Sequence, residues 1–336
     1  MLLQHGTRRS VRRLIAEHGD PLRALLNARP LRARSQIGRL LDECEAAGVS
    51  LLTGAHSRFP ARLKCIPDPP LLLYFTGDPN TLERPAIAIV GARRASRFGI
   101  DIAQRLAKDL ADRGALIVSG LALGIDSAAH KAARDQHGGT LAVLGSGLAR
   151  VQPISNLPLA RALLDSGGGL MSEYPLHEPA LPHHFPERNR LISGLCAGVV
   201  VVEASLRSGS LITARCALEQ GREVMAVPGA AGVPHSAGCN QLLRQGAGLV
   251  ESAADVFDAL GMIASEIPEA FIDRPSPQLG ECAQHVLSLL GATALCADEI
   301  SATLRLTGPE CAVALTELEL AGFVSRSDEG YIRRPS

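Results

Sequence analysis

The middle of the chain repeats one unit, in which a short apolar run is followed by a turn of small residues and then by a stretch with helical spacing. The runs are continuous and rich in Val, Ile, Ala and Leu, which is typical of parallel strands that helices cover on both faces. The predicted strands are residues 86–90, 115–118, 140–144, 169–171, 199–202, 224–227 and, more weakly, 249–250. This alternation predicts right-handed βαβ units and therefore an α/β fold with a doubly wound parallel sheet.

Charge separates the chain into three blocks, although the net charge of all 336 residues is zero. Residues 1–64 carry 12 basic and 5 acidic side chains, residues 65–265 carry 17 and 18, and residues 266–336 carry 5 and 11. This balance excludes a uniformly basic protein that coats nucleic acid. Helical periodicity predicts a small helical domain of the SAM or helix-hairpin-helix kind over 1–64, ahead of the sheet at 65–265. Three amphipathic stretches and a short hairpin pattern predict a winged-helix-like domain over 278–336.

Composition limits the class of protein further. With 46% hydrophobic and 20% charged residues, the chain can bury a sizeable core. No apolar run approaches the roughly 18 residues that span a bilayer, and no apolar segment follows the first basic residues as in a signal peptide. The eight cysteines include no C-x-x-C pair, so neither a disulfide framework nor a zinc site is indicated. We therefore expect a cytoplasmic protein with no membrane span, metal or cofactor.

Almost every predicted strand ends in Gly, Ser or Glu, at the edge where open parallel sheets bind ligands. Small residues there let backbone N–H groups approach an anion, and the following helices direct their positive dipole ends at the same place. This pattern, with three arginines in the first turn, predicts a phosphate site, although the same glycines also suit tight turns that bind nothing. The candidate residues are Gly91, Arg93, Arg94, Ser96, Ser119, Gly120, Gly145, Gly147, Ser208, Gly209, Ser210 and Thr213.

The common nucleotide-binding fingerprints are absent. Gly145-Ser146-Gly147 begins like G-x-G-x-x-G, but Arg150 stands where the third glycine belongs. There is no G-x-x-x-x-G-K-[ST] motif either, which argues against a P-loop NTPase. Because the chain has only three lysines, phosphate contacts would fall mainly to arginines, backbone amides and hydroxyls.

A second cluster lies at residues 183–190, where two histidines, an aromatic ring and two arginines occur together. Cations beside a stacking face are what single-stranded nucleic acid needs, so Phe185, Arg188, Asn189 and Arg190 join the candidates. Two alternatives are weaker. Adjacent histidines point in different directions, which disfavours a metal site, and a solvated loop whose arginines bind carboxylates needs no ligand.

Catalysis is the competing hypothesis. Ser208 or Ser210 fits a helix N-cap better than a nucleophile, because no G-x-S-x-G elbow is present. Glu173 and Glu203 both end strands, so hydrolysis by paired carboxylates stays open. The alternative to a binding protein is thus a nucleotide or nucleoside-phosphate hydrolase that uses one of them with Arg93. A winged-helix transcription factor with a regulatory ligand domain is a third.

The chain resembles the DNA-processing protein A (DprA, or Smf) family over nearly its whole length. The motifs that carry the resemblance occur in order and are long. They are Val90-Gly91-Ala92-Arg93, Ser119-Gly120-Leu121-Ala122, residues 139–147, Ser172-Glu173-Tyr174-Pro175, residues 185–190, Val202-Glu203-Ala204, residues 208–214, Val227-Pro228-Gly229 and residues 238–242.

The resemblance implies an extended Rossmann-like core that binds and protects single-stranded DNA, forms a homodimer and helps load the recombinase RecA during natural transformation, without catalysis. In such a protein Arg93 contacts phosphate, and Ser96 with the amides of Gly91 to Arg94 forms an anion nest. Phe185 packs on or near a base or sugar beside Arg188 and Arg190. Alternatively, some of these three residues hold the loop in shape, the role that suits Asn189 better.

Departures from the family pattern are few. Leu123 replaces an expected arginine, and Ala149 and Gln152 replace an acidic residue and a tyrosine. His183 and His184 stand where arginine or lysine is common, and unperturbed histidines are mostly uncharged at neutral pH. The acidic balance of the last block opposes phosphate contact, so we expect the winged helix to recruit a protein partner or to be idle on DNA.

Overall fold

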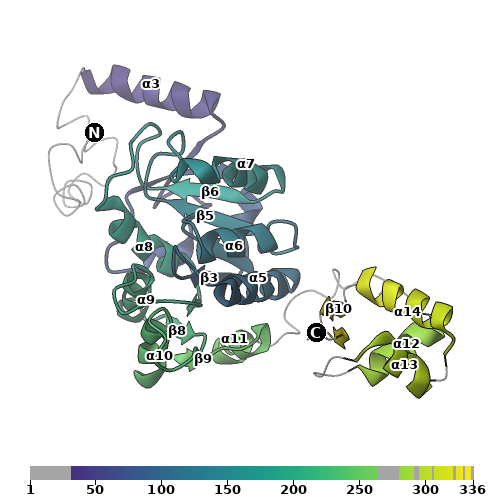
Figure 1. The fold of residues 1–336 in the computed structure, drawn as a ribbon. Helices are drawn as coiled ribbons and strands as arrows, with labels where there is room; N and C mark the ends of the chain where they lie inside the picture. The colour runs from purple at the N-terminus through teal and green to yellow at the C-terminus, as the bar shows by residue number, and fades with distance from the viewer. Residues whose placement is uncertain are drawn as a thin grey trace. The chain divides into compact units, whose positions relative to one another are not determined.

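The computed structural model of the chain describes residues 32–262 continuously, and then 280–290, 295–304, 306–320, 323–327 and 330–333. The chain divides into two compact units at Pro268 (Figure 1). Residues 1–31, where the sequence predicts part of a helical domain, lie outside the described residues. Within the described ranges, no helix is both long and apolar enough to cross a membrane.

The larger unit is built on a nine-stranded sheet with the order β1-β2-β6-β5-β4-β3-β7-β8-β9. Strands β3 to β9 are parallel and match the predicted runs to within one residue at each end. They are β3 (Ala86–Val90), β4 (Leu116–Ser119), β5 (Thr140–Leu144), β6 (Gly169–Ser172), β7 (Gly198–Val201), β8 (Glu223–Ala226) and β9 (Gly248–Leu249). The chain winds from β3 toward β6 on one side and from β7 toward β9 on the other, which confirms the predicted doubly wound α/β fold.

Two further strands, which the sequence analysis did not assign, widen the sheet at one edge. β1 (Ser50–Thr53) pairs antiparallel with β2 (Leu72–Gly77), and β2 pairs antiparallel with β6. Between them in sequence lies the short helix α4 (Ala61–Lys64), whose Leu63 is fully buried in the core of this unit. Residues 50–64 therefore belong to the sheet unit, and a domain boundary at residue 64 is too late.

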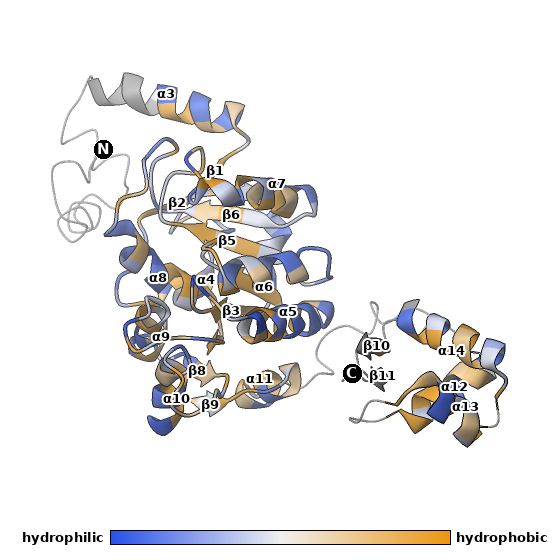
Figure 2. Cartoon of the chain, in the orientation of Figure 1, coloured by the Kyte–Doolittle hydropathy of each residue, from blue (hydrophilic) through white to orange (hydrophobic). Residues whose placement is uncertain are grey.

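Helices cover both faces of the sheet. Helices α5, α6 and α11 pack over one core cluster, whereas α4, α8, α9 and α10 pack over another. Figure 2 shows the strands in orange and pale tones and the helices with blue stripes, as expected for amphipathic helices on an apolar sheet. The bounds are α3 (Arg32–Ala46), α5 (Arg97–Asp112), α6 (Ile125–Ala133), α7 (Leu157–Asp165), α8 (His184–Leu195), α9 (Ser210–Glu219), α10 (Ala237–Arg244) and α11 (Ala253–Ala259).

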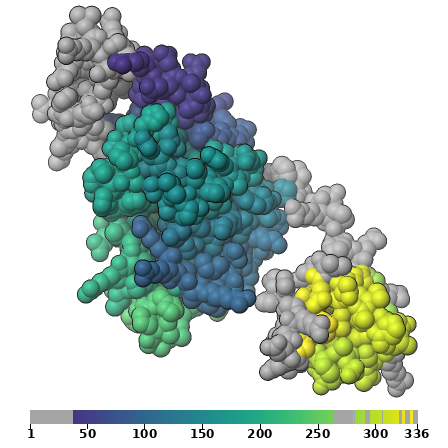
Figure 3. Space-filling model, turned by 45° about the horizontal axis from the view of Figure 1, so that its top comes forward, coloured from purple at the N-terminus to yellow at the C-terminus, as the bar shows by residue number. Residues whose placement is uncertain are grey.

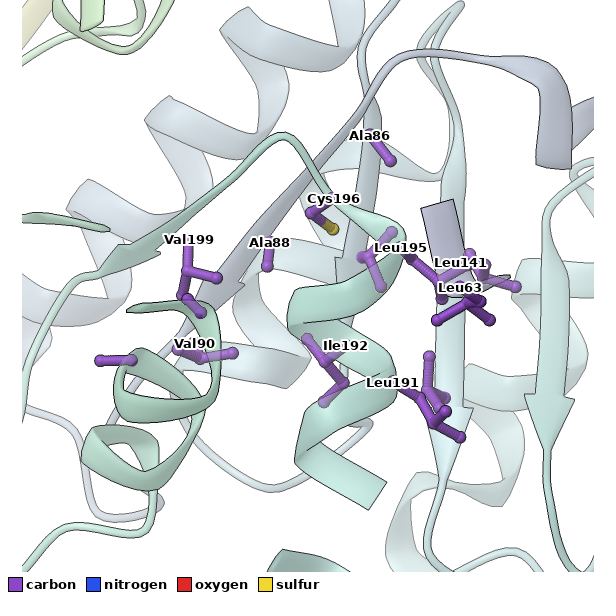
Figure 4. Close-up of a cluster of buried hydrophobic side chains, with 14 of the residues drawn as sticks. Leu63, Ala86, Ala88, Val90, Leu141, Leu191, Ile192, Leu195, Cys196 and Val199 are labelled. Carbon is purple, nitrogen blue, oxygen red and sulfur yellow. The ribbon is translucent and has the colours of Figure 1, made fainter. Parts of the chain in front are cut away.

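Strand β3 contributes side chains to the core clusters on both faces of the sheet. Ala86, Ala88 and Val90 belong to the cluster beneath α8, which Figure 4 shows together with side chains of that helix. Ile87 and Ile89 point to the other face and pack with α5 and α6. Because both faces of the strand are buried, its sequence is apolar throughout rather than alternating.

The described residues of the smaller unit form three helices and a hairpin. Its elements are α12 (Glu281–Leu289), α13 (Ala297–Leu304), α14 (Gly308–Leu320), β10 (Val324–Ser327) and β11 (Gly330–Arg333). The two strands pair antiparallel, and Val286, Ile300, Leu315 and Val324 are buried together in one small core. This arrangement confirms the predicted winged helix.

Candidate nucleic-acid interface

A cavity of about 780 Å³ opens at the carboxyl ends of β3 and β7, between which the direction of winding reverses. Open α/β sheets bind their ligands at such a switch point. We call it the rim cavity. Of the predicted residues it is lined by Gly91, Arg93, Arg94, Phe185, Arg188, Asn189, Ser208, Gly209, Ser210 and Thr213. Its walls thus join the three sequence clusters, and Figure 3 shows how segments far apart in sequence, coloured blue and green, adjoin on the surface of the larger unit.

Arg93 and Phe185 form the part of the rim cavity that best suits a nucleic acid. The Arg93 and Arg94 side chains are exposed, and the Arg93 guanidinium carbon lies 5.3 Å from the centre of the Phe185 ring. This is the geometry of a cation–π contact. A Cβ on Gly145 would come within 3.1 Å of the Phe185 ring, so Gly145 makes room for the ring and does not line the cavity itself.

Arg188 lies beneath the cavity and is only 4% exposed. Its Nη1 donates to the carbonyl oxygens of Gly120 and Val143, which ties α8 to the ends of β4 and β5. Burial lowers the pKa of Arg188 to about 10, and the carboxylate of Asp126 opposes that shift. A Cβ on Gly120 would lie 2.7 Å from the guanidinium. Gly120 is therefore needed for the approach of Arg188, which corrects its predicted role in contacting phosphate.

The backbone N–H groups of the turn after β4 are hydrogen-bonded to the side chain of Asp126. Asp126 accepts hydrogen bonds from the backbone N–H groups of Gly120 (3.0 Å) and Ala122 (3.4 Å), and the first of these was predicted to bind an anion. Leu121 between them has a φ of 55°, an uncommon conformation for leucine. Ser119 is fully buried and donates to the carbonyl of Ile89 at 2.6 Å. These groups thus shape the turn. Ser119 and Gly120 do not line the rim cavity, whereas Ala122 and Asp126 do.

Ser96 also has a structural partner. It caps α5 by accepting from the N–H of Gly99 (3.0 Å), and its hydroxyl donates to Glu203 Oε2 at 2.6 Å. The backbone N–H of Ser96 donates to the same carboxylate. Glu203 is 4% exposed, and a carboxylate at a helix N-terminus is favoured by the helix dipole. Ser96 therefore fixes the arginine-bearing turn instead of offering a free hydroxyl to phosphate.

The remaining residues of the second cluster hold α8 in place. Arg190 donates to both oxygens of Glu173 (2.8 and 2.7 Å) and to Asp68 (3.0 Å), and its side chain is 11% exposed. Asn189 donates to the carbonyl of Gly209 at 3.4 Å, across to the start of α9. The sequence analysis offered the alternative that arginines of this cluster bind carboxylates of the protein and no ligand. Arg190 does so, although it lies on the helix α8 and not in a loop.

The serine-rich segment lies where β7 leads into α9. The Ser208 and Ser210 hydroxyls are 2.7 Å apart, and Thr213 is buried on the first turns of the helix. The residue at the N-cap is Gly209, with no side chain capping the helix. The expected serine cap is therefore not formed. Gly147 does not line the rim cavity. It is buried, and its N–H donates to the carbonyl of Glu178.

The two strand-end carboxylates cannot act as a pair. Glu173 follows β6 and Glu203 follows β7, and these strands are separated by β5, β4 and β3. Four strand spacings place them about 19 Å apart, whereas paired-carboxylate hydrolysis needs at most about 9.5 Å. This removes the paired-carboxylate version of the hydrolase hypothesis.

His235 and His184 differ in their surroundings. His235, in the loop after β8, lines the rim cavity but was not among the predicted residues; the rule that strand ends carry ligands could have found it. His184 is buried, and its ring centroid lies 3.9 Å from that of Tyr174 in a stacked arrangement. Burial lowers the pKa of His184, so this histidine adds no positive charge at neutral pH.

Comparison with known families gives two matches that follow the two units. Residues 50–261 match the model of the family described as DNA recombination-mediator protein A, and residues 272–330 match a family described as the DprA winged helix domain. The first match begins at β1, in agreement with the sheet boundary described above.

Curated relatives and solved structures agree with these families. The chain is 42% identical to protein Smf of Escherichia coli, over 89% of this chain and 81% of that protein. It is 39% identical to DNA processing protein DprA of Bacillus subtilis, over 72% and 79%. The X-ray structure of DNA processing protein A from Streptococcus pneumoniae superposes with a TM-score of 0.61 at 38% identity, over 71% of this chain and 82% of that one. A structure of the Helicobacter pylori protein, described for its unique single-stranded DNA binding mode, has a TM-score of 0.57 at 30% identity, over 63% and 95%.

Proposed function

The chain belongs to the DNA recombination-mediator protein A family, and from this premise we propose that it binds single-stranded DNA in the rim cavity without making or breaking a bond in it. The observation that carries the proposal is the meeting of exposed Arg93 and Arg94 with the half-buried ring of Phe185 at the switch point of the sheet. The structure of the Helicobacter pylori relative, described for its single-stranded DNA binding, supports it.

The cations divide into two kinds. Arg93 and Arg94 are exposed and contact the phosphates of the strand. Arg188 and Arg190 are nearly buried and bind carbonyl and carboxylate groups of the protein, so they position α8 and, through it, Phe185. Few cations therefore contact the strand. This agrees with the net charge of the chain, which is zero. Such binding weakens as salt rises.

Binding without catalysis is the second part of the proposal. Glu203 is engaged by Ser96, Glu173 by Arg190, and the Ser208 hydroxyl by Ser210. The carboxylates and the serine hydroxyl that a hydrolase could use thus have structural partners, whereas Arg93 is exposed. Hydrolysis of a mononucleotide is the outcome that would restore that hypothesis.

Membership of the family supports a more specific role. We infer that the protein forms a homodimer, protects incoming single-stranded DNA and helps load RecA during natural transformation. The winged helix recruits a protein partner in this scheme, because α14 contains no lysine or arginine and carries Glu310, Glu317 and Glu319. A recognition helix that reads DNA normally carries cations.

A gel-shift comparison tests the proposal. The full chain should shift a long oligo-dT, shift a duplex of the same length more weakly, and be insensitive to a mononucleotide competitor. Preference for one duplex sequence would favour the transcription-factor alternative. Competition by the mononucleotide, together with its turnover, would overturn the proposal in favour of a hydrolase.

A further inference from the structure

A second cavity, of about 560 Å³, lies beside the rim cavity at the ends of β7 and β8. Its walls are mainly apolar and include Phe98, Val202, Val227, Pro228 and Val233. We call it the Phe98 cavity. Its size falls within the range of about 300–1,000 Å³ that is typical of sites for small organic groups. Of the residues predicted from the sequence to bind phosphate, only Ser96 lines this cavity.

Phe98 is the unusual feature of this cavity. It lies on the first turn of α5 and is 60% exposed. The chain has only seven phenylalanines and no tryptophan, so large aromatic rings that could stack on a base are few. An exposed ring costs free energy unless something covers it. Phe98 directly follows the exposed Arg97, and the segment between β3 and α5 carries Arg93 and Arg94. A stacking face thus adjoins cations, which is the combination that binds single strands.

The two cavities share one lining residue. His235 lines both of them, from the loop that follows β8. That loop is braced at Gly229, whose N–H donates to Asn240 Oδ1 at 3.1 Å and whose carbonyl accepts from Asn240 Nδ2 at 2.9 Å. The wall opposite Phe98 is therefore held in position before any ligand arrives, which lowers the ordering cost of binding.

Charge decides which part of a strand can enter each cavity. The rim cavity is lined by Arg93 and Arg94 and suits phosphates. The Phe98 cavity is lined by the carboxylate of Glu203, which disfavours a phosphate there but not an uncharged ring. A strand that lies in the rim cavity can therefore send a base, but not its backbone, into the neighbouring cavity.

We propose that the Phe98 cavity is a nucleobase site, in which one unpaired base of the bound strand stacks on Phe98 while the adjoining phosphates lie on Arg93 and Arg94. This inference rests on the proposed function and adds a base-binding site to it. Because stacking uses the face that every base shares, the site tolerates any sequence.

The test compares two ligands of equal length, oligo-dT and an abasic oligomer that has the same phosphates but no bases. Phe98→Leu should weaken the binding of oligo-dT by about fivefold or more, which is the effect of losing one base–aromatic stack. It should leave the binding of the abasic oligomer unchanged. Phe98→Tyr, which keeps the ring, should bind both ligands as the unaltered chain does.

Leu218→Ala is the matched control, because Leu218 is 62% exposed on the last turn of α9 and does not line either cavity. It should change neither affinity. Arg93→Ala distinguishes the proposed function from the base site, since it should weaken the binding of both oligomers. If Arg93→Ala weakens binding and Phe98→Leu does not, no base stacks on Phe98, and the base site is refuted while the proposed function stands. If the unaltered chain binds neither oligomer, the proposed function fails and the base site with it.

Discussion

Replacing Arg188 with methionine should destabilise the larger unit by about 3–5 kcal/mol, because it removes one partner of a buried charged pair. Arg188 is 4% exposed, and its guanidinium donates to the carbonyls of Gly120 and Val143 while it faces Asp126. Methionine keeps much of the length of the side chain, so little of the loss comes from an empty space. Two buried carbonyl groups are left with fewer hydrogen bonds, and each such loss costs about 1–3 kcal/mol.

The same variant should show a pH dependence of known sign. Burial raises the pKa of Asp126, and the Arg188 charge is the largest influence that lowers it. A carboxyl whose pKa is raised by folding destabilises the fold when it is ionised, and this cost disappears as the pH falls through that pKa. The destabilisation by Arg188→Met should therefore be largest at neutral pH and smaller in acid. Adding Asp126→Asn removes the unpaired charge, so the double variant should regain part of the loss.

Urea unfolding of the full chain, followed by far-UV circular dichroism at neutral pH and at about pH 5, measures both effects. The double-variant cycle isolates the interaction of Arg188 with Asp126 from the effects of each substitution alone. A loss below about 1 kcal/mol, the value of an exposed ion pair, would refute the reasoning. So would a double variant that is no more stable than Arg188→Met.

Three further predictions concern single groups. Arg93→Ala should cost about 1–3 kcal/mol in binding to oligo-dT, the value of a lost charge-assisted contact, and an unchanged dissociation constant in a fluorescence titration would show that Arg93 does not touch the strand. Deleting residues 275–336 should leave the affinity for oligo-dT within tenfold of the full chain, and a greater loss in the same titration would place the winged helix on DNA. Burial lowers the pKa of His130 from 6.5 to about 3, so its contribution to stability is lost as the pH falls below 6.5; His130→Gln should give a flatter urea-stability curve between these pH values, and equal slopes would contradict the assignment.

The sequence predicts the strands of the parallel sheet well, because strands buried on both faces leave continuous apolar runs. Residues 86–90 and 140–144 coincide with β3 and β5. The strands β1 and β2 are harder to predict, since they join the sheet by antiparallel pairing across a Pro-rich segment and neither belongs to a repeated unit. The pairing of strands is decided by the folded chain as a whole and leaves no local pattern in the sequence.

The site could be predicted in part for a similar reason. Strand ends and arginine-rich turns predict where a ligand would bind, and the structure brings two of the predicted residues, Arg93 and Phe185, into contact. The partners that occupy the other candidates are far away in sequence. Ser96 meets Glu203, 107 residues later, and Arg190 meets Asp68, 122 residues earlier. Composition and spacing predict that such a group is polar, but they cannot tell whether a ligand or the protein itself satisfies it.

The most direct test of the account is the salt dependence of oligo-dT binding by the unaltered chain, by Arg93→Ala and by Arg161→Ala. Arg161 is exposed on α7 and does not line the rim cavity, so it loses the same charge without losing a contact. For a single strand, each phosphate contact adds about 0.7 to the slope of log affinity against log salt. The account predicts that Arg93→Ala lowers the slope by about this amount and that Arg161→Ala leaves it unchanged. Equal slopes for all three proteins would contradict the claim that a strand lies on the arginines of the rim cavity.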